Sequence, residues 1–412
     1  MTLILLKAGL IILPYYETLM RGCPLAIVQA PDTRVAKAFL GIWVALAIGL
    51  TSLYAGEIRG CKNKWLILFL IFIPLNIHLS PKYNIEINGI DSTNYWVWKP
   101  FVMILCYFLM FMAVQSLNIT RKSLRSIFSV VMWCGFIMGG YVLLQNAGWD
   151  QFFSKRLGDQ FLAVTKPVTV GTLGNSTIVS PYIAMIVPFA LYFNRYIIST
   201  VLILAVIATQ SAMAIGAMVV SVILYSCLRW RVKASIAVLA VIIISASLLI
   251  NVKTTNPSQY ANIMSNITNT NGRIPVWKET IRIIKEEEIG NKIKSRYPFT
   301  GVGLGSYPIL IRPLIKTMFS KAHNEYLEIL CTLGIIGLIL FLLSIGYMMK
   351  SAFYAYIDDF NRLELITLMS SFVCIALIAG GTFVWQIAPT IFYTIIIVGL
   401  LHNRRILNGE LE

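Results

Sequence analysis

The sequence predicts an all-α, polytopic integral membrane protein with about 12 transmembrane helices and one large extracytoplasmic loop that contains an amphipathic helix. Three observations lead to this fold class. The 412 residues are 58% hydrophobic and 13% charged, with a mean hydropathy of +0.76, which is too apolar for a soluble protein of this length. Apolar runs of about 20 residues recur, each long enough to cross a hydrocarbon core as a helix. A long polar stretch interrupts these runs late in the chain.

The apolar runs divide the chain into three parts. Residues 1–250 form a predicted N-terminal transmembrane bundle of about nine spans, residues 251–323 form the large loop, and residues 324–412 form about three spans and a short tail. No short charged region with a small-residue cleavage site opens the chain, so we expect the first run to remain as a helix. The predicted spans have the approximate limits 3–19, 38–55, 65–79, 100–118, 127–145, 176–194, 197–209, 213–228, 234–250, 324–347, 363–379 and 385–401.

The positive residues of the short loops predict the orientation of the chain. If the spans alternate, fourteen Lys and Arg residues fall on one side of the membrane and eight on the other. We expect the richer side to be cytoplasmic, with both termini there, so that residues 251–323 face outward. The eleven Lys and Arg residues of this long loop do not contradict the orientation, because long loops translocate largely regardless of charge.

Net charge and cysteine content exclude several classes of protein. A net charge of +16 also occurs in nucleic-acid-binding proteins, but in a membrane protein we attribute it to topology and to contact with anionic lipids, and we expect no nucleic-acid partner. The seven cysteines are scattered, mostly within apolar runs, with neither a metal-ligand spacing nor a disulfide framework. The outer loops contain no Asp-x-Asp pair and no His/Cys cluster, so we expect no metal and no cofactor.

Residues 271–285 of the large loop have the pattern of an amphipathic helix. Ile274, Trp277, Ile281 and Ile284 recur at helical spacing and predict one apolar face, and Trp277 is expected to pack the helix or to stack on a sugar. A membrane-interface anchor is the simpler interpretation of this pattern. Arg273 at the helix start favours a binding role beyond that of an anchor, because a guanidinium beside free N–H groups is a good site for a phosphate or diphosphate.

A glycine-rich segment and a histidine follow. The run Gly301-Val-Gly-Leu-Gly-Ser306 predicts either a close backbone approach to a phosphate or sugar, or a turn packed against the helices. It lacks the Lys-Ser/Thr ending of a nucleotide-binding loop. His323 opens the tenth span as either a general base or a helix cap, with Glu325 or Glu328 near enough to orient its ring. His402 is expected to be a solvated tail residue.

These residues, taken together, resemble the signature domain shared by bacterial O-antigen ligases and related O-antigen or exopolysaccharide polymerases. The likeness consists of three ordered motifs that lead to Gly334-Ile-Ile-Gly337. They are Gly-Arg-x-x-x-Trp (Gly272, Arg273, Trp277), Pro-x-x-Gly-x-Gly-x-Gly (Pro298, Gly301, Gly303, Gly305) and His-Asn-x-x-Leu (His323, Asn324, Leu327). A weaker likeness lies upstream, where Gly171-Thr-Leu-Gly-Asn175 precedes a span that contains Pro188.

The resemblance implies a glycosyltransferase of the bacterial inner membrane, with its active site on the periplasmic side. Such enzymes move a glycan from undecaprenyl diphosphate to an acceptor hydroxyl, on lipid A–core in ligases or on a second lipid-linked unit in polymerases, without ATP or metal. The compact chain and its single large loop favour a ligase. His323 would be the base and Arg273 would hold the diphosphate. The expected substrate-binding residues are Trp277, Arg296, Gly301, Gly303, Gly305, Arg312, Lys321 and Asn324.

One position departs from the family pattern. Related ligases often carry a further arginine after a serine near the start of a span, whereas the comparable stretch here, Thr209-Gln-Ser-Ala-Met213, has Ala212 at that place. A second cation for the diphosphate would then come from Lys166, Arg296, Arg312 or Lys321, or be absent. A transporter is the second class of function, but the predicted span interiors are nearly free of charge. A non-catalytic membrane assembly ranks third, since it leaves the ordered motifs unexplained.

Overall fold

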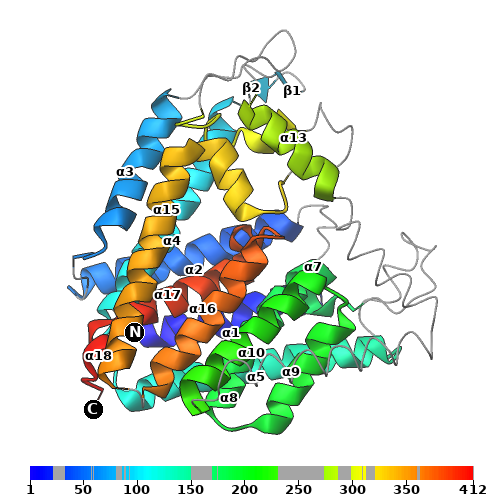
Figure 1. The fold of residues 1–412 in the computed structure, drawn as a ribbon, viewed down its shortest axis with the longest axis vertical. Helices are drawn as coiled ribbons and strands as arrows, with labels where there is room; N and C mark the ends of the chain where they lie inside the picture. The colour runs from blue at the N-terminus through cyan, green and yellow to red at the C-terminus, as the bar shows by residue number, and fades with distance from the viewer. Residues whose placement is uncertain are drawn as a thin grey trace.

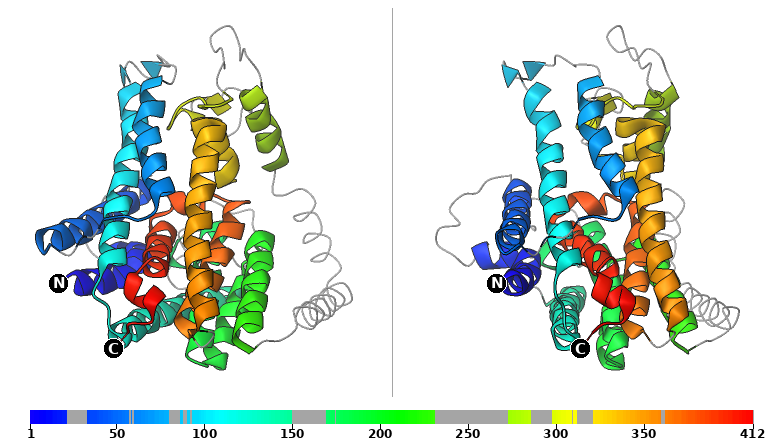
Figure 2. Two further views of the ribbon diagram at one scale, coloured as in Figure 1. Left: turned by 60° about the vertical axis from the view of Figure 1, so that its left-hand side comes forward. Right: turned by 90° about the vertical axis from the view of Figure 1, so that its left-hand side faces the viewer.

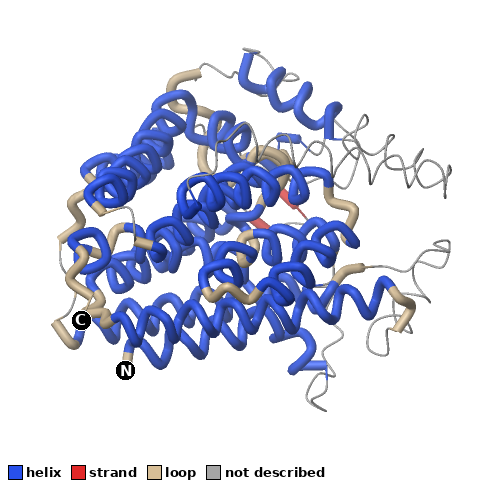
Figure 3. Tube along the Cα trace, turned by 60° about the horizontal axis from the view of Figure 1, so that its bottom comes forward, coloured by secondary structure: helices blue, strands red, loops and turns tan. Residues whose placement is uncertain are grey.

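The computed structural model of the chain describes residues 1–21, 33–56, 58, 60–79, 86–87, 90–91, 93–149, 169–173, 175–230, 273–285, 298–308, 310–311, 321–359 and 362–411. Within these ranges the fold is helical, as predicted, apart from one two-residue strand pair, β1 (Glu86–Ile87) and β2 (Ile90–Asp91). Figure 3 shows how far helices dominate the described trace. The helices are α1 (Thr2–Arg21), α2 (Thr33–Tyr54), α3 (Lys64–Leu79), α4 (Thr93–Ser116), α5 (Arg121–Asn146), α7 (Ser176–Ala184), α8 (Val187–Tyr192), α9 (Tyr196–Ala208), α10 (Ala212–Trp230), α13 (Arg273–Lys285), α15 (Glu325–Asp358), α16 (Leu363–Ala379), α17 (Ala388–Leu401) and α18 (Arg404–Asn408), with 3-10 turns η1 (Gly171–Leu173) and η4 (Val384–Gln386).

Helices occupy eleven of the twelve predicted spans, and the ninth, 234–250, lies outside the described residues. Three of the described helices are long and apolar enough to cross a membrane, namely α5, α10 and α15, and eight further apolar helical stretches are shorter. The apolar helices support a membrane protein, while the number of twelve spans stays a prediction. The predicted span 176–194 is two helices, because Pro188 has no N–H to donate and its ring clashes with the carbonyl of Ala184.

The helices form two crossing groups. In Figures 1 and 2, α3, α4 and α15 stand upright beside one another, while α1, α2 and α5 run across them. The main hydrophobic core lies where the groups meet, and α17 is part of it. Its buried Tyr393 donates a hydrogen bond to the carbonyl of Leu10 in α1 (2.7 Å) and accepts one from Tyr182 in α7 (2.9 Å). Each such buried bond stabilises the fold by about 1 kcal/mol and fixes how three helices meet.

The C-terminal segment after α17 folds back against the helices. His402 is only 8% exposed, and its ring lies 6.0 Å from that of Phe111. The neighbouring Asn403 donates to the carbonyls of Val114 and Leu117, and the guanidinium of Arg362 donates to the carbonyl of Leu407. These contacts hold the segment down, so the prediction of a solvated His402 is wrong.

Helix α15 is kinked at Gly334, and the kink is built around two glycines. Gly334 has φ 68° and ψ −173°, a conformation that is essentially restricted to glycine. Gly301 (φ +74°) lies against it so closely that a Cβ on either residue would come within 2.5 Å of the other's backbone. Four backbone hydrogen bonds join residues 298–303 to residues 331–336, a contact that we call the glycine clasp. They run from Val302 N to Cys331 O, Gly303 N to Thr332 O, Ile335 N to Pro298 O and Ile336 N to Phe299 O, at 2.9–3.1 Å. The clasp pairs the carbonyls and amides that the kink releases from the helix ladder.

The clasp predicts the stability of glycine variants. Gly334→Ala introduces a Cβ about 2.3 Å from the Phe299 carbonyl and a strained backbone, so we expect it to lower the free energy of unfolding by about 2 kcal/mol or more. Gly346→Ala, in the same helix but with open space around its Cβ position, is the matched control and should be neutral or slightly stabilising. Thermal unfolding of the purified variants in detergent measures both effects. Equal midpoints for the two variants would contradict this role of the clasp.

Candidate functional site

Four segments that are distant in sequence meet at one end of α15, beside α13 (Figure 1). They are α13 itself, residues 298–311, the turn 321–324 that precedes α15, and residues 380–387 between α16 and α17. A small hydrophobic cluster that includes Ile283, Val302, Tyr307 and Cys331 joins the first three. The hydroxyls of Tyr307 and Thr280 lie 2.7 Å apart and add a buried hydrogen bond between α13 and the glycine-rich segment. This packing fixes α13 against the first turn of α15.

Helix α13 forms where the sequence predicts it, but with a different buried face. Its buried residues are Arg273, Val276, Thr280 and Ile283. Ile274 and Ile281 of the predicted apolar face are 38% and 42% exposed, so this face is not the one that packs inside the protein. Relative to the predicted orientation, the helix is turned about its axis so that an arginine, a threonine and two aliphatic residues face the protein.

Arg273 is the first residue of α13 and is 9% exposed. Its guanidinium donates a hydrogen bond to the carbonyl of Gly381 in the α16–α17 connection. Burial lowers the pKa of this guanidinium. Within the described ranges no carboxylate lies at ion-pair distance from it. A buried cation whose one described hydrogen bond goes to a carbonyl is an attractive position for an anionic ligand, because the ligand would supply an opposite charge.

His323 has a backbone that its neighbours hold in an uncommon conformation. Its φ of 52° lies in the left-handed region. On one side the carbonyl of Ala322 accepts from the Trp277 indole (2.9 Å), and the amide of Ala322 donates to Glu328 (3.0 Å). On the other side Asn324 caps α15 by accepting from the amide of Leu327 (3.0 Å). Trp277 therefore acts on His323 through the backbone, and the position of the histidine is set by contacts on both sides.

The half-buried imidazole of His323 lies against the loop that also holds Arg273. Its ring is 4.8 Å from that of Phe383, edge to face. Burial and, to a smaller extent, the positive charge of Arg273 together lower the pKa of His323 to about 4. The imidazole is therefore neutral at pH 7 and able to accept a proton. Because the charge of Arg273 acts on His323, the two residues lie near each other in the fold, although they are fifty residues apart in the sequence.

Glu325 and Glu328 hold the turn and the α16–α17 connection together. Glu325, 4% exposed, accepts from the Trp385 amide and the Gln386 side chain, both at 2.9 Å. Glu328 accepts from the same Gln386 nitrogen (3.1 Å) and forms an ion pair with Lys321 (3.3 Å). Both glutamates lie in the first turn of α15. We conclude that this network positions the backbone around His323.

The remaining predicted site residues have mixed outcomes. Gly301 and Gly303 form the glycine clasp, which is the turn interpretation of the glycine run, and Gly305 also has a positive φ of 81°. Lys321 is paired with Glu328. Arg296 and Arg312 lie outside the described residues, as does Lys166. Among the described residues, no group of three His, Cys, Asp or Glu side chains could hold a metal.

Sequence reasoning missed the connection between α16 and α17, residues 380–387. It contributes the Gly381 carbonyl to Arg273, the Phe383 ring to His323 and Gln386 to both glutamates. The hydroxyl of Thr382 is buried there without a hydrogen-bond partner in the described part of the chain. The available signal was the unusual run Gly380-Gly-Thr-Phe-Val-Trp-Gln386 between two apolar segments.

The stretch in which related ligases carry a second arginine is adjacent to this connection. A Cβ on Gly381 would lie 2.6 Å from atoms of the Met213 side chain, so the start of α10 packs beside the carbonyl that Arg273 contacts. Ala212 is exposed there. Ala212 directly precedes Met213, and its methyl group supplies no charge.

The electrostatic link between Arg273 and His323 is testable by titration. Burial and a nearby cation disfavour the imidazolium, so His323 in the folded protein stays unprotonated until the pH falls to about 4. Arg273→Gln should raise this pKa toward 6.5, whereas Lys278→Gln, which removes an exposed charge from the same helix, should leave it unchanged. Histidine-selective NMR in detergent micelles measures both values. An identical shift in the two variants would contradict the specific pairing.

Comparison with known proteins extends this description. A family model described as O-antigen ligase matches residues 197–342, a stretch that contains Arg273, the glycine clasp and His323. No curated protein matches the chain. The matched stretch also includes α9, α10 and the first half of α15, so it covers most of the candidate site except the α16–α17 connection. The resemblance carried by the three ordered motifs is therefore confirmed over residues 197–342, which match the O-antigen ligase family.

Proposed function

We propose that the chain is a membrane glycosyltransferase that transfers a glycan from undecaprenyl diphosphate to an acceptor hydroxyl on the periplasmic face of the bacterial inner membrane. We further propose that it is an O-antigen ligase, whose acceptor is lipid A–core. One observation carries the proposal: a buried arginine without a carboxylate partner among the described residues lies close to a histidine that is neutral at pH 7, inside the stretch that matches the family.

Arg273 is proposed to bind the donor diphosphate. Its guanidinium presents planar donors that suit phosphate oxygens, and only one described bond, to Gly381, engages them. As the bond between the anomeric carbon and the phosphate oxygen breaks, negative charge grows on the leaving diphosphate. A fixed, largely desolvated cation stabilises that charge more strongly in the transition state than in the ground state.

His323 is proposed to act on the acceptor. The new bond forms between the acceptor oxygen and the anomeric carbon, and the proton of the acceptor hydroxyl passes to the imidazole. A pKa of about 4 makes the free site a weak base at first. The bound diphosphate offsets the charge of Arg273, so the basicity of His323 increases only when the donor is in place. This arrangement suits transfer that depends on a bound donor.

The surroundings are compatible with sugars and with lipid. Thr382, between the residues that contact Arg273 and His323, has a buried hydroxyl without a partner in the described ranges, which could bond a sugar hydroxyl. Ile274 and Ile281 are exposed on α13, an arrangement typical of helices that lie at a membrane interface. Both features support a site between an aqueous glycan and a lipid-linked donor, with the large loop and its helix on the periplasmic side.

A reconstituted transfer assay tests the proposal. The purified protein is supplied with an undecaprenyl-diphosphate glycan and either lipid A–core or a second lipid-linked unit, and the product is followed. We expect His323→Gln to lower kcat/KM by about 10²–10⁴-fold through loss of the base. Arg273→Gln should lower it by about 10²–10³-fold through loss of charge stabilisation.

Arg282→Gln is the matched control, because it removes an exposed arginine from the same helix and should keep wild-type activity. Thermal unfolding of each variant separates loss of the site from loss of the fold. Near-wild-type transfer by His323→Gln would refute the proposed base. Transfer to the second lipid-linked unit but not to lipid A–core would replace the ligase assignment by a polymerase.

A further inference from the structure

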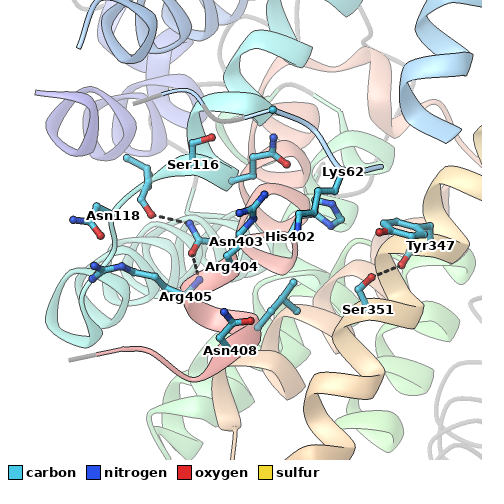
Figure 4. Close-up of a pocket in the computed structure, with 14 residues that line it drawn as sticks. Lys62, Ser116, Asn118, Tyr347, Ser351, His402, Asn403, Arg404, Arg405 and Asn408 are labelled. Atoms are coloured by element: carbon cyan, nitrogen blue, oxygen red, sulfur yellow. Dashed lines mark hydrogen bonds between the residues drawn. The ribbon is translucent and has the colours of Figure 1, made fainter. Parts of the chain in front are cut away.

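A polar cavity lies where the C-terminal segment folds back against the helices. It has a volume of about 280 Å³ and is lined by residues 60–62, 115–118, part of α15 and residues 402–408 (Figure 4). In Figure 1, α18 lies near the lower end of α15, whereas α13 lies near its upper end. Neither Arg273 nor His323, nor any residue of the connection 380–387, lines it. The cavity is therefore separate from the candidate site.

The charged side chains around this cavity are all positive. Lys62, Arg404 and Arg405 line it, and no described carboxylate lies at ion-pair distance from any of them. Lys62 and Arg404 are exposed, so water reaches both side chains. Three cations around one concave surface raise the local potential and attract an anion.

A buried histidine forms part of the cavity wall. His402 lines the cavity, is 8% exposed, and its Nδ1 has no hydrogen-bond partner in the described part of the chain. Burial lowers the pKa of His402, and the charges of Arg404 and Lys62 lower it further. Both cations thus act on the ring, although they come from different loops. A negatively charged ligand would relieve the repulsion between them.

We propose that this cavity binds a phosphate group, carried either by the headgroup of an anionic phospholipid or by a small phosphate ion. Guanidinium and ammonium groups are the usual partners of phosphate oxygens, and Arg404 and Arg405 can each offer paired donors. The volume is slightly below the usual range for small-molecule sites, so it suits a headgroup or a single phosphate better than a glycan. The proposal does not depend on the catalytic function proposed for His323.

The experiment measures the affinity of the full chain, purified in neutral detergent, for two probes. One is phosphatidylglycerol, with phosphatidylcholine as its neutral counterpart, followed by native mass spectrometry. The other is inorganic phosphate, with chloride at equal ionic strength, followed by thermal shift. We expect Arg404→Gln to weaken binding about tenfold, the usual effect of losing one charged hydrogen bond. Arg404→Lys should recover most of the loss, and Lys62→Gln, in another loop, should weaken binding similarly.

Arg229→Gln is the control, because Arg229 is on α10 and does not line the cavity. It should bind like the wild type. Binding of phosphatidylglycerol alone identifies the lipid headgroup, and binding of both probes identifies the phosphate group itself. No binding of either probe overturns the proposal. So does an equal loss in Arg229→Gln and Arg404→Gln, because the effect would then reflect net charge.

Discussion

The contact between Gly301 and Gly334 is the constraint on which the candidate site depends. Two backbones meet there at a distance that admits no side chain on either residue. The contact bends α15 and fixes the direction of its first turn, which carries Glu325 and Glu328. Those glutamates in turn hold the Ala322 amide and the α16–α17 connection. A shift of about one ångström in this backbone contact would therefore move α15, and with it both His323 and the Gly381 carbonyl.

The electrostatics of the candidate site oppose the stability of the fold. A guanidinium is buried against a carbonyl, and a histidine is held nearby in a left-handed backbone conformation with a lowered pKa. Neither arrangement favours folding, since the burial of a cation and the strain of a residue each oppose it. The surrounding hydrophobic cluster and the glutamate network offset this cost. Such local destabilisation is common where a protein prepares charge for a ligand.

The sequence contained enough to predict the helices, and it also singled out Arg273 and His323, which the fold brings near each other. Apolar runs predict helices because, in a membrane, each run must satisfy its backbone hydrogen bonds internally. The exception is the run that contains Pro188, which forms two helices. Arg273 and His323 stood out because charge is rare in this chain. The buried face of α13 could not be predicted, since it pairs Arg273 and Thr280 with aliphatic residues. The clasp between Gly301 and Gly334 and the role of residues 380–387 arise from tertiary contacts that no local pattern encodes.

The alanine at position 212 gives His323 a larger part in the proposed reaction. The start of α10 packs beside Gly381, whose carbonyl accepts a hydrogen bond from Arg273, and Ala212 in this segment supplies no charge. Lys321, the described alternative, is occupied by Glu328. A leaving diphosphate carries more charge than one guanidinium can balance. In the proposed mechanism His323 becomes a cation as it takes the acceptor proton, at the moment when charge develops on the leaving group. The imidazolium thus supplies positive charge beside Arg273 in the transition state, where a second arginine would supply it at all times.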